Sequence, residues 1–164
     1  MSVSPAEFTS GMRRLAAGIT IVTVAHEGRS GGLTATAVTS LTAQPPRLLV
    51  CVNVDAEAHA MITAARSFAV NVLAEPHAAL AERFGGRTGV FGQERFQAGS
   101  WTTLETGAPI LADALAVFDC TLEKEMAAST HTIFIGDVVA TAMGEGRPLL
   151  WANGGFAGIS HPRS

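Results

Sequence analysis

A stretch of small and hydroxyl-bearing residues from Gly31 to Asn53 constrains the fold of this chain more than any other segment. It reads GGLTATAVTSLTAQPPRLLVCVN: threonines alternating with small apolar residues, a Pro-Pro break, and a dense apolar run. Alternation with a period of two predicts a half-buried β-strand, and the Pro-Pro pair predicts a break before the next strand. So many hydroxyls beside so little bulk would accommodate a flat ligand with polar edges. An ordinary half-buried strand explains the same pattern, so the residues alone leave both interpretations open.

The rest of the chain predicts a mainly β, α+β fold in which mostly antiparallel strands are flanked by short helices. Ser4, Pro5 and Glu7 form a capping box with proline in the first turn, so a helix is expected from there to about Gly18. Further helices are expected over residues 56–65 and 76–84. Strands are expected over residues 19–25, 31–38, 48–53, 68–73, 114–126, 130–143 and 149–151. No linker or repeat divides the chain, so residues 1–164 are expected to form a single domain.

Composition argues against several classes of function. The net charge is −3 and no run of Lys or Arg occurs, which argues against nucleic-acid binding. The longest apolar run, Leu48 to Val52, is too short to cross a bilayer, and the start MSVSPAEF does not resemble a signal peptide, so we expect a cytoplasmic protein. Because 48% of the residues are hydrophobic and 15% are charged, we expect part of the apolar surface to lie against a second copy in a homodimer.

No motif supplies a catalytic group of its own. Cys51 and Cys120 lie far apart without zinc-ligand spacing, so both are expected to be reduced and no metal site is expected. Neither a GxSxG elbow nor a phosphate-binding glycine motif occurs. What remains is a site of backbone, small residues and hydroxyls, which suits a cofactor that brings its own reactivity. A flavin fits, because its ring edge binds backbone N–H groups and its flat face needs small neighbours such as Gly32, Ala35 and Ala37.

Five segments taken together resemble the flavin reductase-like family, in an order and spacing that match over nearly the whole chain. They are GGLTATAVTSLTAQPPRLLVCVN at residues 31–53, SFAVNVL at 67–73, FGGRTGVFGQERF at 84–96, FDCTLEKEM at 118–126 and THTIFIGDV at 130–138. The resemblance implies an FMN-binding split barrel, a six-stranded antiparallel Greek-key barrel with flanking short helices that pairs as a homodimer with flavin near the subunit boundary. It also implies the reductase component of a two-component flavin-dependent monooxygenase. The FGGRTG block, Trp101 and PILADALAVFDC at 109–120 are most similar to the reductases of pyrimidine-ring-opening pathways.

The resemblance also assigns flavin-binding roles to three segments. Main-chain groups and hydroxyls of the TATAVTSL segment are expected to hold the isoalloxazine edge. The end of the CVN strand is expected to lie toward the ribityl chain, and the start of the FGGRTG loop to contact the flavin. The expected flavin-binding residues are Thr34, Ala35, Thr36, Thr39, Ser40, Leu41, Cys51, Asn53, Phe84 and Gly85. A strand-ending turn for Asn53 and a core position for Phe84 are the structural alternatives.

His131 matches the histidine of the family's GDHxxxxG pattern, with Gly136 as its last glycine. In the family this histidine lies where the nicotinamide ring enters, so His131 is expected to orient the nicotinamide as the catalytic residue. Ser129 and Thr130 stand where relatives have Gly-Asp, which alters the approach to the histidine. A lone histidine at the start of a strand is also commonly a structural group, and that interpretation stays open.

The flavin phosphate lacks its usual partners in this chain. Relatives place Ser and Thr after the CVN strand, whereas this chain has Asp55, Ala56 and Glu57. The phosphate would then meet backbone N–H groups at the start of the following helix, or Arg66 or Arg87, against the opposing charge of the two carboxylates. Weak binding of this kind suits a flavin that leaves after reduction.

These observations predict a reductase that transfers hydride from NADH, or NADPH, to FMN, or FAD, and releases reduced flavin to a partner monooxygenase. Hydride transfer needs stacked rings with the reacting atoms about 3 to 3.5 Å apart, and no protein general base. A flavin-binding or electron-transfer module without reductase activity is one alternative. Reduction of another acceptor through flavin, such as a corrinoid or a ferric complex, is the other.

Overall fold

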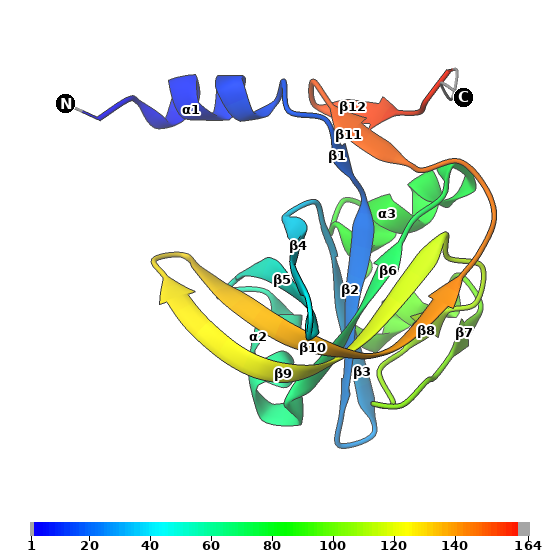
Figure 1. The fold of residues 1–164 in the computed structure, drawn as a ribbon. Coiled ribbons are helices and arrows are strands. Elements are labelled where there is room, and N and C mark those ends of the chain that lie inside the picture. Colours follow the sequence, from blue (N-terminus) through cyan, green and yellow to red (C-terminus); the bar gives the residue numbers. More distant parts are fainter. Residues whose placement is uncertain (1, 161–164) are drawn as a thin grey trace.

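Seven antiparallel strands form one strongly curved sheet at the centre of the computed structural model, which describes residues 2–160 (Figure 1). Their order across the sheet is β3-β2-β6-β9-β10-β5-β4. The strands are β2 (Thr20–His26), β3 (Arg29–Ala35), β4 (Val38–Ala43), β5 (Pro46–Asn53), β6 (Ser67–Val72), β9 (Ala116–Ala128) and β10 (His131–Met143). A mainly β architecture with short flanking helices confirms the predicted fold class.

The two edges of the sheet are joined by a short stretch of chain. Strand β3 is one edge and β4 the other, yet only Thr36 and Ala37 separate them in sequence. Three Cα steps reach at most roughly 11 Å, so the two edges must come close together and the sheet curls into a barrel. The barrel is split at residues 36 and 37, because β3 and β4 do not pair with each other.

Smaller elements surround the barrel. The helices are α1 (Pro5–Met12), α2 (Glu57–Ala65) and α3 (Ala78–Phe84), with short 3-10 helices at Glu75–His77 and Gly92–Gln97. A three-stranded sheet consists of β1 (Ala17–Gly18), β11 (Leu150–Ala152) and β12 (Gly155–Ala157), and a two-stranded one of β7 (Trp101–Thr102) and β8 (Ile110–Leu111). None of the described helices is long and apolar enough to cross a membrane.

Strand β2 divides the buried side chains between two cores, because successive residues of a strand face opposite sides. Ile21 belongs to the α3 core, which includes Leu80 and Phe84 of that helix. Val22 belongs to the α2 core, which includes Ile62 of α2 and Phe134 of β10. Each face of the sheet is thus covered, and this explains why β2 is buried along most of its length.

The long hairpin of β9 and β10 crosses the barrel and extends beyond it (Figure 1). Its register shifts between Ile135 and Gly136, where the Phe68 ring of β6 packs against β10. A Cβ atom on Gly136 would lie 2.7 Å from both the Phe68 ring and the Cys120 Cβ, closer than real Cβ contacts. Packing against Phe68 is therefore enough to require a glycine at position 136, the last glycine of the GDHxxxxG pattern.

Helix α1 extends away from the barrel and has no buried residue (Figure 1). Its capping box forms as predicted: the Glu7 N–H donates to Ser4 Oγ, and the Ser4 N–H donates to the Glu7 carboxylate at 2.9 Å. The hydrogen bonds from Ser4 lower the pKa of Glu7. The side chains of Phe8, Met12 and Leu15 remain 60%, 48% and 63% exposed. Residues 2–160 thus leave these apolar side chains largely uncovered.

The structure corrects the prediction in three places. The barrel sheet has seven strands rather than six, because β4 is a strand of its own. The first helix ends at Met12 and not near Gly18, because Ala17–Gly18 pairs with β11 as a strand and no residue of α1 is buried by the described chain to support further turns. Between the expected helix at 76–84 and the expected strand at 114–126, where no element was predicted, the structure has a 3-10 helix at Gly92–Gln97. A single domain over residues 1–164 stays a prediction, because the last four residues lie outside the described range.

Candidate functional site

A cavity of about 220 Å³ lies between β3, α3 and the C-terminal hairpin of β11 and β12. We call it the hairpin cavity. Its lining residues are Ile19, Thr34, Thr36, Ala81, Glu82, Gly85, Arg87, Trp151 and Phe156. Three of the predicted flavin-binding residues, from two separate segments of the chain, therefore meet at one place.

Two threonines of the predicted segment differ in what their hydroxyls do. The Thr34 hydroxyl donates to the Ala81 carbonyl at 2.6 Å and so ties β3 to α3. Thr36 lies at the barrel split, and its hydroxyl makes no hydrogen bond within the described chain. The carbonyls of Thr36 and Ala37 accept backbone bonds from Val38 and Cys51. Their N–H groups donate to no backbone carbonyl among residues 2–160 and remain free for a ligand.

The C-terminal end of α3 forms one side of the cavity. The Gly85 N–H donates to the Ala81 carbonyl at 2.9 Å, and a Cβ on Gly85 would lie 3.1 Å from that oxygen. Phe84 is 1% exposed and packs its ring against Phe96 at 5.0 Å and Trp101 at 5.5 Å. The structure thus places Gly85 at the cavity and Phe84 in the α3 core.

Two arginines hold the glycine-rich loop at residues 85–91 against the barrel. Arg95 donates to the Gly32 carbonyl on β3 at 2.9 Å and to the Val90 carbonyl at 3.1 Å. Arg83 donates to the carbonyls of Glu94 and Arg95. Charged donors on backbone carbonyls are stronger than neutral ones, so the end of the loop and the 3-10 helix after it are held against β3 and α3.

The C-terminal hairpin forms an aromatic wall that was not predicted from the sequence. Trp151 and Phe156 pack edge to face, with ring centroids 5.3 Å apart. The turn between them is Asn153-Gly154, with φ of 52° and 78°. An Asn-Gly pair between two short apolar segments is a strong hairpin signal, and it would have identified this element.

Two further predicted residues, Thr39 and Ser40, line a different groove. It has a volume of about 430 Å³ and lies between β4, β5, β9 and β10; Val38, Phe118 and Val138 contribute to its mainly apolar lining. We call it the β4 groove. Leu41, on the same strand, is 45% exposed.

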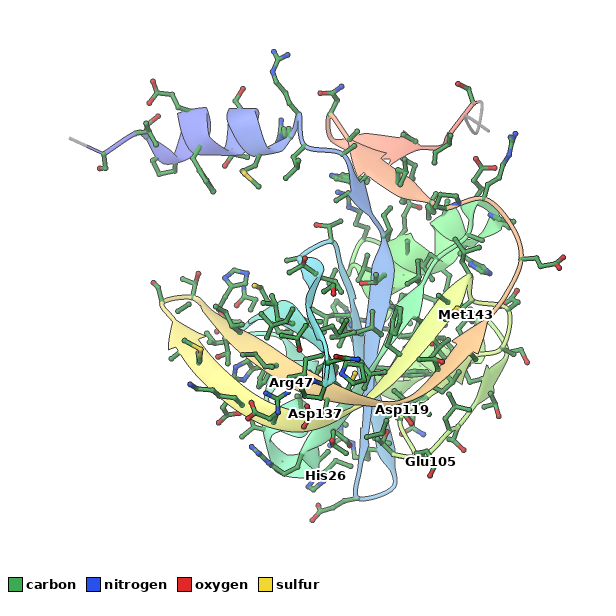
Figure 2. The ribbon with its side chains drawn as sticks, viewed as in Figure 1. His26, Arg47, Glu105, Asp119, Asp137 and Met143 are labelled. Carbon is green, nitrogen blue, oxygen red and sulfur yellow. The ribbon has the colours of Figure 1, made fainter. Side chains whose placement is uncertain are left out.

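An ion pair lies at the edge of the β4 groove. Arg47 of β5 donates to the Asp137 carboxylate of β10 at 2.5 Å, and Glu123 lies 3.7 Å from the guanidinium. Figure 2 shows Arg47 and Asp137 side by side where the two strands meet. The hydrogen bond with Asp137 raises the pKa of Arg47, which keeps the guanidinium charged. The charge is neutralised by neighbouring carboxylates and is not available to a phosphate.

The remaining predicted residues lie along the pairing of β5 with β10. Asn53 is opposite His131 in the register, and its side-chain oxygen accepts the Asp55 N–H at 2.9 Å. His131 is exposed, with Nδ1 3.0 Å from the Thr130 hydroxyl. Cys51 is half-buried on the same strand as Asn53. None of these three residues lines the hairpin cavity.

Two of the small residues have structural reasons for their size. Gly32 is buried, and a Cβ there would lie 2.9 Å from the Phe84 ring. Ala35 is 8% exposed within the α2 core, and its carbonyl accepts the Thr20 hydroxyl. Their small side chains therefore fit the packing of the barrel itself.

The lining of the hairpin cavity contains no cysteine or histidine and one carboxylate, Glu82. It offers backbone N–H groups, a free hydroxyl, two aromatic faces and one guanidinium. Such a set binds and orients a flat ligand but supplies no nucleophile and no acid-base pair. A site of this kind requires a cofactor for redox chemistry.

Comparison with known proteins identifies the class. The sequence profile described as flavin reductase like domain matches residues 12–160. The chain is 44% identical over 146 residues to the FMN reductase (NADH) RutF of Ancylobacter novellus, covering 89% of this chain and 80% of that one. The split barrel and its cofactor-type cavity are thus those of a flavin reductase fold. This chain belongs to the flavin reductase-like domain family.

Solved structures agree with this assignment. BorF, the flavin reductase component of a bacterial two-component tryptophan halogenase, superimposes with a TM-score of 0.88 at 30% identity, covering 97% of this chain and 100% of BorF. Component B of nitrilotriacetate monooxygenase from Mycobacterium thermoresistibile superimposes with a TM-score of 0.87 at 27% identity, covering 97% and 90%. Both likenesses thus cover 97% of this chain.

Proposed function

We propose that this protein is an NADH-dependent FMN reductase that transfers hydride from the nicotinamide to the flavin and supplies reduced flavin to a partner monooxygenase. The observation that carries the proposal is the hairpin cavity, in a chain 44% identical to an FMN reductase (NADH). Its lining holds groups that position a cofactor and none that perform covalent catalysis.

The residues at the barrel split fit a flavin ring edge. The free N–H groups of Thr36 and Ala37 are donors suited to the ring carbonyls and nitrogens, and the Thr36 hydroxyl lies beside them. When bound, the flavin supplies the hydride acceptor. Backbone donors fixed in place before the reaction stabilise negative charge as it develops, without any cost of reorganisation.

The aromatic wall has a separate role in this proposal. Trp151 and Phe156 form an apolar side of the cavity that excludes water from the reacting rings. Gly85, on the opposite side, leaves room for the ligand to approach α3. The chain thus contributes binding, orientation and exclusion of water, which is what hydride transfer between two cofactors requires.

His131 orients the nicotinamide in the proposed mechanism, and Cys51 and Asn53 lie toward the ribityl chain. Thr39, Ser40 and Leu41 of β4 extend the flavin-binding segment beyond the split. These residues lie on strands β4, β5 and β10, and none of them lines the hairpin cavity within one chain. A second copy of the chain would bring both sets to a common site.

A homodimer is therefore part of the proposal, and three observations support it. The hairpin cavity, at about 220 Å³, is smaller than the ~300–1,000 Å³ of most ligand sites. Helix α1 exposes Phe8 and Met12, the turn after it exposes Leu15, and none of the three is buried by residues 2–160. The β4 groove is mainly apolar as well. Exposed apolar surfaces of this kind are typical of subunit contacts.

The partner monooxygenase and the cytoplasmic location rest on the comparisons and on chemistry. One structural relative is named as the flavin reductase component of a two-component halogenase, and another as component B of a monooxygenase. Both cysteines are free, which suits a reducing compartment.

The test is NADH oxidation by the purified protein under anaerobic conditions, with FMN, FAD or riboflavin as acceptor. We expect rates far above the reaction of NADH with free flavin, and higher rates with NADH than with NADPH. A rate equal to that of free flavin would refute reductase activity and favour a flavin carrier. Activity that appears only after a corrinoid or ferric complex is added would indicate a different final acceptor.

A further inference from the structure

Arg87 is the cation of the hairpin cavity. It comes from the glycine-rich loop, and its guanidinium lies over the Trp151 ring, 4.9 Å from the centroid. Stacking on an indole restricts the guanidinium while leaving its edge N–H groups free to donate. The pair joins the glycine-rich loop to the C-terminal hairpin across the mouth of the cavity.

Four other arginines have donors occupied by groups of this chain. Arg29 pairs with Glu57 at 3.2 Å and Arg47 with Asp137 at 2.5 Å. Arg83 and Arg95 donate to backbone carbonyls. Within residues 2–160, no carboxylate or carbonyl accepts a hydrogen bond from the Arg87 guanidinium. Its charge is therefore available to an anionic ligand.

The start of α2 is a poor alternative for an anion. Ala56 is the N-cap and offers no hydroxyl, and the Asp55 N–H is already bound by Asn53. Glu57 places a carboxylate in the first turn. The Glu57 carboxylate and the occupied Asp55 N–H group both disfavour a phosphate at the start of α2, although the helix dipole favours an anion there.

We propose that Arg87, held over Trp151, binds a phosphate group of the nucleotide that enters the hairpin cavity. It thereby takes the place of the hydroxyls that are missing after β5. A guanidinium fork matches two phosphate oxygens at once, so the contact also fixes the orientation of the nucleotide. Glu82 lines the same cavity and opposes an anion, which keeps the binding moderate.

The proposal rests on the proposed function, since it takes FMN and NADH as the nucleotides. The shared chemistry is a phosphate ester, from the FMN monophosphate or from the dinucleotide's diphosphate. Isothermal titration calorimetry separates these sources with two ligand pairs: FMN against riboflavin, and NAD⁺ against nicotinamide riboside. In each pair the second ligand keeps the ring and lacks the phosphate, and nicotinamide riboside also lacks the adenosine of NAD⁺.

The test variants are Arg87→Met and Arg87→Lys, with Arg147→Met as a control of equal charge change at an exposed arginine outside the cavity. We expect Arg87→Met to weaken FMN or NAD⁺ binding about 10-fold or more, because a charge-assisted bond is lost. The matching ligand without phosphate, riboflavin or nicotinamide riboside, should bind Arg87→Met with the same affinity as the wild type. Arg87→Lys should lose less, and Arg147→Met should match the wild type.

Equal weakening of both members of a pair, or no weakening of any ligand, would overturn the proposal. Arg87 is exposed on a loop, so these substitutions leave both cores intact. NADH oxidation by the wild type with riboflavin tests the proposed function separately, because that flavin carries no phosphate. If the wild type oxidises NADH with riboflavin no faster than free riboflavin does, the reductase activity is refuted. If the wild type is active but Arg87→Met binds both nucleotides as tightly as the wild type does, only the phosphate contact is refuted.

Discussion

Two threonines two residues apart allow a direct test of how β3 builds the site. The Thr34 hydroxyl donates to the Ala81 carbonyl at 2.6 Å, whereas the Thr36 hydroxyl has no partner in the described chain. Thr34→Val removes a hydrogen bond between β3 and α3. The Ala81 carbonyl keeps the Gly85 N–H, so it is not left without a donor. We therefore expect a loss of about 1 kcal/mol in the free energy of unfolding.

That loss corresponds to a fall of roughly 2–4 °C in melting temperature for a chain of this size. Thr36→Val should leave the melting temperature unchanged and weaken riboflavin binding about 5-fold, which is about 1 kcal/mol. Thermal unfolding by circular dichroism, at one protein concentration, and calorimetric titration with riboflavin measure the two effects. The reasoning fails if Thr34→Val keeps full stability and weakens riboflavin as much as Thr36→Val does.

Three further outcomes are expected. Gly136→Ala should lower the free energy of unfolding by about 1–3 kcal/mol in urea, because its Cβ would meet the Phe68 ring at 2.7 Å; an unchanged midpoint would contradict the packing. Burial, with the nearby carboxylates, raises the pKa of Cys120 to about 12, so below that pH the thiol stays neutral. Ellman's reagent should then modify Cys51 alone in the folded protein at pH 8, and equal rates for both thiols would refute this. His131→Ala should raise the KM for NADH more than the KM for FMN, and an unchanged nicotinamide KM would return His131 to a structural role.

The sequence predicts the elements that carry strong periodicity. The strands around Leu48–Asn53 and the long hairpin of β9 and β10 appear near their expected bounds, because apolar alternation and β-branched residues mark them. Strand β4 was missed because its residues are nearly all exposed, so no inward-facing side chains give an alternating signal. Its pairing with β5 depends on backbone hydrogen bonds, which the side-chain pattern does not reveal.

The site was predicted less completely than the fold. Thr36 and Gly85 reach the same cavity, as their shared assignment implied. Phe84 and Ala35 have their side chains in the cores, since strand alternation and the end of α3 turn them inward, and their contact with flavin stays a prediction. Trp151 and Phe156 were missed because they come from a hairpin far away in sequence, although Asn153-Gly154 signals its turn. Contacts between residues far apart in sequence, such as Arg87 over Trp151, are not marked by any local sequence pattern.

The most direct test of the central claim is a crystal structure of the protein with FMN bound. The ring edge should lie against the N–H groups of Thr36 and Ala37 at the barrel split, with the wall of Trp151 and Phe156 close to the ligand. The phosphate position would show at the same time whether Arg87 reaches it. A flavin bound elsewhere, with no contact to the barrel split or the hairpin cavity, would contradict the assignment of this cavity as the cofactor site.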